Sequence, residues 1–373
     1  MTTLPGLYIH IPFCVKKCEY CAFYSVTDLT LIPDFLAALR REMSLYCDNS
    51  DPFDTVYIGG GTPSVLTPVD LERLTADIRR NFSITPDAEI TVEVNPSDIT
   101  ARFLKSLRHA GVNRLNIGVQ SFDDSLLAFL GRRHDCSQAL SAVETSRAAG
   151  FKNIGIDLIY GIPGQTLPSW LASLQEAVDL NPDHLSCYQL TIEAGTPLGE
   201  CFRKGKVILS DESLQADFFL RTSEALEDAG YIHYEVSNFA RYNSVSRHNS
   251  KYWNHTPYLG LGPAAHSFHE NERRWNHRSL NAYIQDLEAG VPPIEARELL
   301  TGGQLRLESL IFGFRTRMGI HLETFRKRHG QDLFSEKWDL LEKLAGEGLV
   351  EIREGYLRPT RAGMAVADSL ALI

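Results

Sequence analysis

Short runs of apolar and β-branched residues alternate with amphipathic segments over the first half of the chain. The runs have the length and composition of β-strands, and the segments between them have the periodicity of helices. In the segment 67–82, Thr67, Pro68 and Asp70 suit the N-cap, N1 and N3 positions, and Gly111 suits the residue after the next helix. The expected strands are 7–12, 55–61, 89–96, 114–122, 153–163 and 184–192, and the expected helices include 33–46, 67–82, 99–111 and 167–180.

Strands and helices that alternate at a spacing of about 30 residues predict parallel strands joined by right-handed crossovers. This pattern indicates an open or closed α/β barrel. Functional groups of such folds gather at the carboxyl ends of the strands. The ends of these runs hold "CVKKCEYC", "GGGTP", "EVNP", "GVQS" and "IDLIYG", so polar and glycine residues are expected together on one rim.

The pattern changes after residue 210. A long helix is expected over 211–230, followed by a short strand-like stretch and then by an aromatic, histidine-rich segment, 241–278, that we expect to be irregular. From about residue 300 the chain is mostly helical, with a strand pair turning near Glu354 and Gly355, which predicts a small winged-helix-like domain. The expected organisation is therefore a barrel domain, a connecting region and a helical carboxyl-terminal domain, at 1–240, 241–299 and 300–373.

Composition restricts the class of protein. The 373 residues are 43% hydrophobic and 23% charged, as in a globular protein of two domains, and the chain has no apolar run long enough to span a membrane. The first residues carry no secretory pattern, so the cytoplasm is the expected location. A formal charge of −10 argues against nucleic acid as a partner.

Three of the seven cysteines, Cys14, Cys18 and Cys21, lie within eight positions. A structural zinc site would need a fourth ligand close by, so zinc fits this spacing poorly. Three thiolates on one loop can instead bind three irons of a 4Fe-4S cluster and leave the fourth iron open. The other four are scattered without ligand-like spacing and are expected to be buried small apolar residues: Cys47, Cys136, Cys187 and Cys201.

The C-x3-C-x2-C spacing, with Tyr20 before the last cysteine, resembles the signature of radical S-adenosylmethionine (SAM) proteins. The resemblance implies a partial (β/α)6 barrel related to the TIM barrel, a 4Fe-4S cluster on the three cysteines, and SAM bound to the open iron. Three glycines alone indicate only a tight turn, but Gly59 to Gly61 after a strand are similar to the family's SAM loop. Further positions that match SAM contacts of the family are Tyr8, Tyr20, Gly60, Gly61, Thr62, Glu93, Gln120, Arg132 and Asp157. Any one of them, taken alone, is equally compatible with a capping or rim residue.

The whole chain resembles the oxygen-independent coproporphyrinogen oxidase branch of that family. The oxidase pattern has a further cysteine two positions after the third, where this chain has Phe23, and it has a longer amino-terminal arm. Both departures resemble the HemW-type relatives, which are regarded as heme chaperones for heme-dependent respiratory enzymes. The resemblance implies heme and heme-accepting proteins as partners, some of them membrane-associated, and leaves self-association open. The alternative is a radical enzyme that acts on a porphyrin.

The stretch "RHNSKYW" contains an HNxxYW motif that resembles one linked with heme in these relatives. Its residues are His248, Asn249, Tyr252 and Trp253, and an imidazole is a good iron ligand. The same residues could instead close a domain interface. Other histidines that compete as ligands are His255, His266, His269 and His277. On the first strand, His10 is expected to support the cluster or fill the barrel mouth rather than to take part in catalysis.

Overall fold

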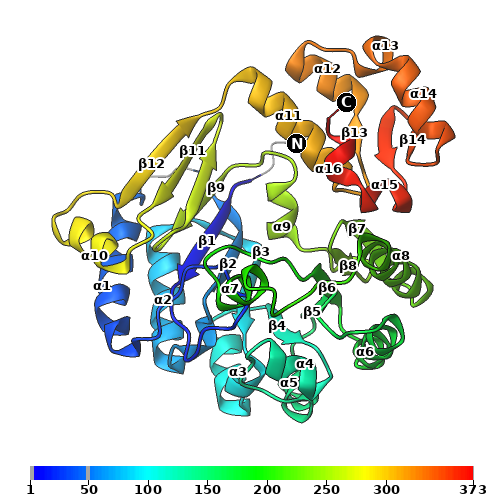
Figure 1. The fold of residues 1–373 in the computed structure, drawn as a ribbon. Helices are drawn as coiled ribbons and strands as arrows, with labels where there is room; N and C mark the ends of the chain where they lie inside the picture. The colour runs from blue at the N-terminus through cyan, green and yellow to red at the C-terminus, as the bar shows by residue number, and fades with distance from the viewer. Residues whose placement is uncertain (1–3, 48–50, 373) are drawn as a thin grey trace.

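The computed structural model describes residues 4–47 and 51–372, and its first half is a partial barrel of six parallel strands (Figure 1). The strands are paired in chain order, as the alternation of the sequence predicts. Helices cover the outside of this sheet. The elements are β1 (Gly6–Ile11), α1 (Ile32–Leu45), β2 (Phe53–Gly60), α2 (Pro68–Asn81), β3 (Ile84–Val94), α3 (Ala101–His109), β4 (Arg114–Gln120), α4 (Asp124–Phe129), α5 (Cys136–Ala148), β5 (Ile154–Tyr160), α6 (Leu167–Asp179) and β6 (His184–Gln189), with 3-10 turns at Leu29–Leu31, Pro63–Val65 and Pro96–Asp98.

Successive side chains of each strand point alternately outward, into a core layer beneath the helices, and inward, into the lumen of the barrel. In β1, Leu7, Ile9 and Ile11 are fully buried beneath the surrounding helices, whereas Tyr8 and His10 point to the other face. The predicted helix signals are confirmed. Thr67 and Asp70 form a capping box at the start of α2, and Gly111 has a φ of +84° directly after α3.

The segment after residue 210 is more regular than the sequence suggests. Four of its strands extend the barrel sheet beyond β1, in the order β9, β10, β11, β12, and β9 runs parallel to β1. The expectation of an irregular region at 241–278 is therefore wrong, because short strands with few apolar residues carry a weak periodicity. The elements are α7 (Pro197–Arg203), α8 (Glu212–Asp228), β7 (Ile232–Glu235), β8 (Asn238–Ala240), α9 (Arg247–Tyr252), β9 (Tyr258–Leu261), β10 (His266–His269), β11 (Glu272–Asn276), α10 (Leu280–Glu288) and β12 (Ile294–Leu299).

A buried carboxyl group joins this extension to the barrel. Glu42 of α1 is fully buried and accepts hydrogen bonds from Tyr283 Oη (2.6 Å), Asn276 Nδ2 (2.6 Å) and the Gly262 amide (2.8 Å). Burial raises the pKa of Glu42 to about 7. The extension is thus anchored on α1 by one polar cluster as well as by apolar packing.

The carboxyl-terminal elements form a lobe with a core of its own beside β7 and α8 (Figure 1). A three-stranded antiparallel sheet with a turn at Glu354 and Gly355 packs against helices, which confirms the winged-helix-like expectation. The lobe is joined to the barrel sheet at β7, where the Val236 amide donates to the Arg315 carbonyl at 2.8 Å. Its elements are α11 (Gly302–Phe314), β13 (Ile320–His321), α12 (Leu322–His329), α13 (Leu333–Glu336), α14 (Trp338–Gly346), β14 (Val350–Arg353), β15 (Tyr356–Pro359), α15 (Arg361–Ala365) and α16 (Ala367–Leu370).

Among the described residues, no helix has the length and apolar character needed to cross a membrane.

Candidate functional site: the barrel mouth and the amino-terminal end

The three clustered cysteines lie on the loop that follows β1, at the carboxyl end of the barrel strands. Cys14 is nearly buried, and its Sγ is 3.4 Å from Thr62 Oγ1; Cys18 and Cys21 are partly exposed. No three His, Cys, Asp or Glu side chains within 4–47 and 51–372 are grouped so that they could hold a single metal ion. A 4Fe-4S cluster places each thiolate on a different iron, so it does not require the three sulfur atoms to converge on one ion.

The glycine loop after β2 is tied directly to the cysteine loop. The Gly61 amide donates to the Ile11 carbonyl and the Thr62 amide to the Phe13 carbonyl, both at 2.8 Å. A Cβ on Gly61 would lie 2.6 Å from the Phe13 carbonyl oxygen, and Gly60 has a φ of +111°, a conformation that favours glycine. These close approaches explain why the sequence has glycines here, because a side chain at either position would collide with a neighbouring group.

Glu93, at the end of β3, faces the same loop. Its Oε1 accepts a hydrogen bond from Tyr57 Oη at 2.7 Å, and its Oε2 accepts one from the Gly60 amide at 3.2 Å. Burial raises the pKa of Glu93 to about 7, and the nearby Asp157 adds to the effect. A cationic ligand in the lumen would stabilise the ionised form, so this carboxyl group is suited to bind an amino group.

Arg132 reaches the lumen although it lies beyond its strand. Its Nη2 donates to the Gly118 carbonyl at 2.6 Å, and its Nη1 is 3.4 Å from Cys18 Sγ. Asp157 of β5 accepts from Asn116 Nδ2 at 2.7 Å through one carboxylate oxygen. The other oxygen, Oδ1, and Arg132 Nε are buried and have no hydrogen-bond partner among the described residues. Unsatisfied buried polar atoms are rare, so these two are available to a ligand in the lumen.

The remaining predicted SAM positions also border this space. Gln120 ends β4 with a φ of +69°, which is uncommon for a residue other than glycine and turns the chain at the barrel mouth. Tyr20 lies on the cysteine loop, and Tyr8 projects into the lumen from β1. Tyr8 Oη is 3.0 Å from His10 Nδ1, and His10 Nε2 is 2.9 Å from the Tyr24 carbonyl oxygen. His10 therefore connects Tyr8 to the backbone just after the cysteine loop, and its support of the cluster stays a prediction.

Sequence reasoning missed two residues of the lumen. Tyr57 orients Glu93, and Asn116 orients Asp157. The period-two alternation of "TVYIGGG" could have found Tyr57, because it places Tyr57 on the same face of β2 as Gly59. For Asn116 the same alternation relates it to Gly118 on β4.

The HNxxYW motif lies at the opposite end of the barrel. It forms α9, which closes the amino-terminal ends of β1 to β3: the His248 amide donates to Glu89 Oε1 at 3.0 Å. The His248 ring is buried, with Nδ1 2.9 Å from Thr55 Oγ1 and Nε2 2.8 Å from Tyr252 Oη. Burial lowers its pKa to about 3. Both nitrogens are engaged and inaccessible, so this arrangement does not fit the expected role of His248 as a heme ligand.

Trp253, the last residue of the motif, lies at the domain interface. Its ring packs edge-on against Phe312 of α11, with centroids 5.9 Å apart. Asn249 donates its amide to the Ser246 hydroxyl at the start of α9. His248 and Tyr252 thus pack against the barrel strands and Trp253 against α11, an arrangement that agrees with the domain-interface role that the sequence left open.

The other histidines that were considered as iron ligands differ in whether another side chain already contacts the imidazole. His255 is 3.1 Å from Glu308, and His277 is 3.0 Å from Asp286, so each has a carboxylate partner. His266 stacks on Trp275, with ring centroids 5.5 Å apart. His269 is exposed, and among the described residues none forms a hydrogen bond or ring contact with its imidazole.

Comparisons with known proteins agree with this geometry. The family model described as "Radical SAM superfamily" matches residues 8–177, and that described as "HemN C-terminal domain" matches residues 300–366. The fold also superposes on coproporphyrinogen III oxidase (HemN) from Escherichia coli, a radical SAM enzyme, with a TM-score of 0.85 and 27% identity over 99% of this chain and 89% of that chain. Fold and site thus define a radical SAM protein, whose cofactors are a 4Fe-4S cluster and SAM.

Two relatives show to which branch of the radical SAM proteins the chain belongs. The chain is 34% identical over 373 residues to the heme chaperone HemW of Bacillus subtilis, with 98% of each protein covered. It is also 34% identical over 389 residues to the mitochondrial radical S-adenosyl methionine domain-containing protein 1 of Mus musculus, with 100% of this chain and 87% of the relative covered. The chain belongs to the HemW family of heme chaperones.

Proposed function

We propose that this protein binds heme and transfers it to heme-dependent proteins, and that it carries a 4Fe-4S cluster and SAM at the barrel mouth. The observation that carries the proposal is the identity with the HemW chaperone of Bacillus subtilis along almost the entire chain. Phe23 supports it, because its side chain is 70% exposed beside the cysteine loop at the position where the oxidase pattern has a further cysteine.

In this proposal Cys14, Cys18 and Cys21 hold the cluster. The SAM site is formed by the glycine loop and Glu93, with contributions from Tyr8, Tyr20, Thr62, Gln120, Arg132 and Asp157. The cluster and SAM together supply one-electron chemistry when bound. The chain itself orients SAM through Glu93 and the backbone of the glycine loop, and Arg132 lies against the Cys18 sulfur.

The test is an anaerobic titration of the purified full-length protein with heme, with and without the reconstituted cluster. We expect saturable, stoichiometric binding in both cases, because an iron porphyrin requires only an apolar slot and an iron ligand. Subsequent mixing with an apo heme protein should move the Soret absorbance to the acceptor. Failure of the wild-type protein to bind heme under either condition would refute the carrier function.

A radical enzyme that acts on a porphyrin is the second candidate. It is favoured by the complete set of polar groups in the lumen and by the structural likeness to the Escherichia coli oxidase. Incubation of the reduced protein with SAM and coproporphyrinogen III tests it: release of carbon dioxide and formation of 5′-deoxyadenosine would support the enzyme, and their absence alongside heme binding would support the carrier.

Three finer expectations belong to the same proposal. The acceptors include membrane-associated respiratory enzymes, the protein works in the cytoplasm, and self-association, which the sequence leaves open, would take the form of a homodimer. Sedimentation of the holoprotein with and without heme tests the last of these. The predicted limits of the domains, 240 and 299, also remain a proposal, which limited proteolysis would check at the two connections.

A further inference from the structure

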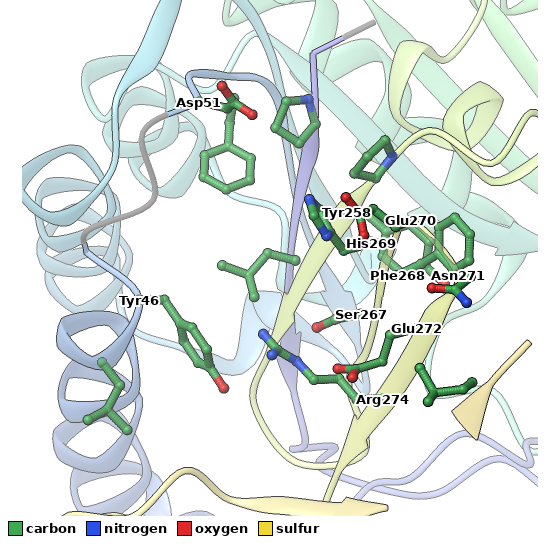
Figure 2. Close-up of a pocket in the computed structure, with 16 residues that line it drawn as sticks. Tyr46, Asp51, Tyr258, Ser267, Phe268, His269, Glu270, Asn271, Glu272 and Arg274 are labelled. Atoms are coloured by element: carbon green, nitrogen blue, oxygen red, sulfur yellow. The ribbon is translucent and has the colours of Figure 1, made fainter. Parts of the chain in front are cut away.

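A cavity of about 620 Å³ lies on the outer side of the sheet extension, away from the barrel lumen. It is bounded by the end of α1 on one side and by β9, β10 and β11 on the other (Figure 2). None of its lining residues belongs to the cysteine loop or to the predicted SAM set. Its volume falls within the range of roughly 300–1,000 Å³ that is typical of sites for small molecules and cofactors.

Strand pairing places a defined set of side chains on the cavity floor. His269 lies opposite Glu272, and Ser267 lies opposite Arg274, so these four share one face of β10 and β11. The buried Leu259 of β9 adds an apolar surface to that floor. The floor therefore combines an imidazole and a guanidinium group with apolar and hydroxyl neighbours.

The opposite wall is apolar and aromatic. Leu45 and Tyr46 project from the last turn of α1, and Figure 2 shows the Arg274 guanidinium extending across the cavity towards Tyr46. The Arg274 Cζ is 4.9 Å from the centre of the Tyr46 ring. Phe53, at the start of β2, completes this side. A flat, largely apolar molecule could lie between this wall and the strands.

We infer that an iron porphyrin occupies this cavity, with His269 as the axial ligand of its iron and Arg274 as the partner of a propionate. The inference rests on the proposed function of heme binding. Imidazole is the axial ligand of many heme proteins, and His269 points into the same space as Arg274. Unlike His248, His255 and His277, it has no partner in the described structure that would compete with iron.

The spacing of the two polar groups suits this ligand. His269 and Arg274 are diagonal neighbours on paired strands, which places them about 7–8 Å apart at the backbone. A guanidinium group binds carboxylates through two parallel hydrogen bonds, and the propionates lie at the porphyrin edge. Asp51, Glu270 and Glu272 also border the cavity. Their repulsion of the propionates limits affinity, which suits a carrier that must release its cargo.

The HNxxYW motif supports the cavity from behind. Tyr252 packs edge-on against Tyr258 with ring centroids 4.8 Å apart, and Tyr258 lines the cavity. His248 holds Tyr252 through the 2.8 Å hydrogen bond. Loss of His248 would therefore disturb the cavity wall without removing the iron ligand.

The test is heme titration of the full-length protein and of His269→Ala, Arg274→Gln and His266→Ala. His266 is the matched control, because it lies on the same strand but on the other face, against Trp275. We expect His269→Ala to shift the Soret band and weaken heme binding roughly tenfold or more, or about 1.4 kcal/mol. Added imidazole should restore the wild-type spectrum. Arg274→Gln should weaken binding without a change of ligand signature, and His266→Ala should behave as wild type.

The outcomes separate the two proposals. If the wild-type protein binds no heme, the proposed function fails and the site with it. If the wild-type protein binds heme and His269→Ala retains both its spectrum and its affinity, only the site assignment is overturned. An unchanged melting temperature and cluster signal of His269→Ala would exclude a folding defect as the cause of lost binding.

Discussion

Nδ1 of His248 lies 2.9 Å from Oγ1 of Thr55, although 193 positions separate the two residues in the chain. The contact fixes α9 against the amino-terminal end of β2. The HNxxYW motif is thereby held at the end of the barrel strands opposite the cysteine loop. For β1, a rise of about 3.3 Å per residue puts roughly 16 Å between the two ends.

Replacing His248 with Ala should lower the free energy of unfolding by about 3 kcal/mol, because it opens a cavity and leaves the hydroxyl groups of Thr55 and Tyr252 without their partner. Chemical denaturation would measure this. The heme-bound spectrum should keep its ligand signature. His109→Ala, an exposed histidine of α3, serves as control and should change the unfolding free energy by less than about 0.5 kcal/mol.

Single Ala substitutions of Cys14, Cys18 or Cys21 should abolish or severely reduce the 4Fe-4S signal after anaerobic reconstitution, because each thiolate binds one iron. Iron counting and electron paramagnetic resonance provide the measurement. Cys201→Ala, which alters a cysteine outside this loop, should retain the full signal. A triple variant of the loop cysteines that still carries the cluster would refute the assignment.

Glu93→Gln should weaken SAM binding roughly tenfold or more, since it removes the charge that pairs with the SAM amino group. Tyr57→Phe should have a smaller effect in the same direction, because it removes the 2.7 Å hydrogen bond that orients the carboxylate. The change that SAM causes in the paramagnetic resonance of the reduced cluster reports binding. Both variants should assemble the cluster normally; equal SAM affinity in Glu93→Gln and wild type would contradict the site.

Glu42 should make stability depend on pH. Burial raises its pKa from an ordinary 4.5 to about 7, so between these values the folded state keeps a proton that the unfolded state has lost. The free energy of unfolding should therefore fall as pH rises from about 4.5 to 7, by up to about 3 kcal/mol from this group. Glu42→Gln should reduce the slope of that part of the profile without abolishing it, because burial also raises the pKa of Glu93 to about 7. Glu144→Gln, on the exposed face of α5, should leave the profile as in wild type.

Much of the barrel could be predicted from patterns of neighbouring residues in the sequence. The six parallel strands, the capping box at Thr67 and the turn at Gly111 follow from periodicity and from backbone preferences, which act over a few residues. The carboxyl-terminal hairpin at Glu354 and Gly355 was found in the same way. By contrast, β9 to β12 could not be predicted from the sequence. They are stabilised by pairing with β1 and with one another, and their own residues do not alternate clearly between apolar and polar.

The residues of the candidate site also differ in whether the sequence alone could identify them. The prediction that Cys14, Cys18 and Cys21 hold the cluster rests on their spacing on one loop, so it needs the sequence alone. Arg132 could not be placed from the sequence, because only the path of the chain after β4 brings its guanidinium group to Gly118 and Cys18.

The sequence by itself determined the order of strands and helices, the cysteine loop and the glycine loop, because spacing and backbone freedom are properties of neighbouring residues. The tertiary structure alone decided that His248 is buried and His269 is exposed, since both are histidines in the same aromatic segment. Their difference comes from long-range packing: α9 is enclosed by the ends of β1 to β3, whereas β10 presents one of its faces to a cavity beside α1. Such contacts depend on the path of the whole chain, which no local pattern encodes.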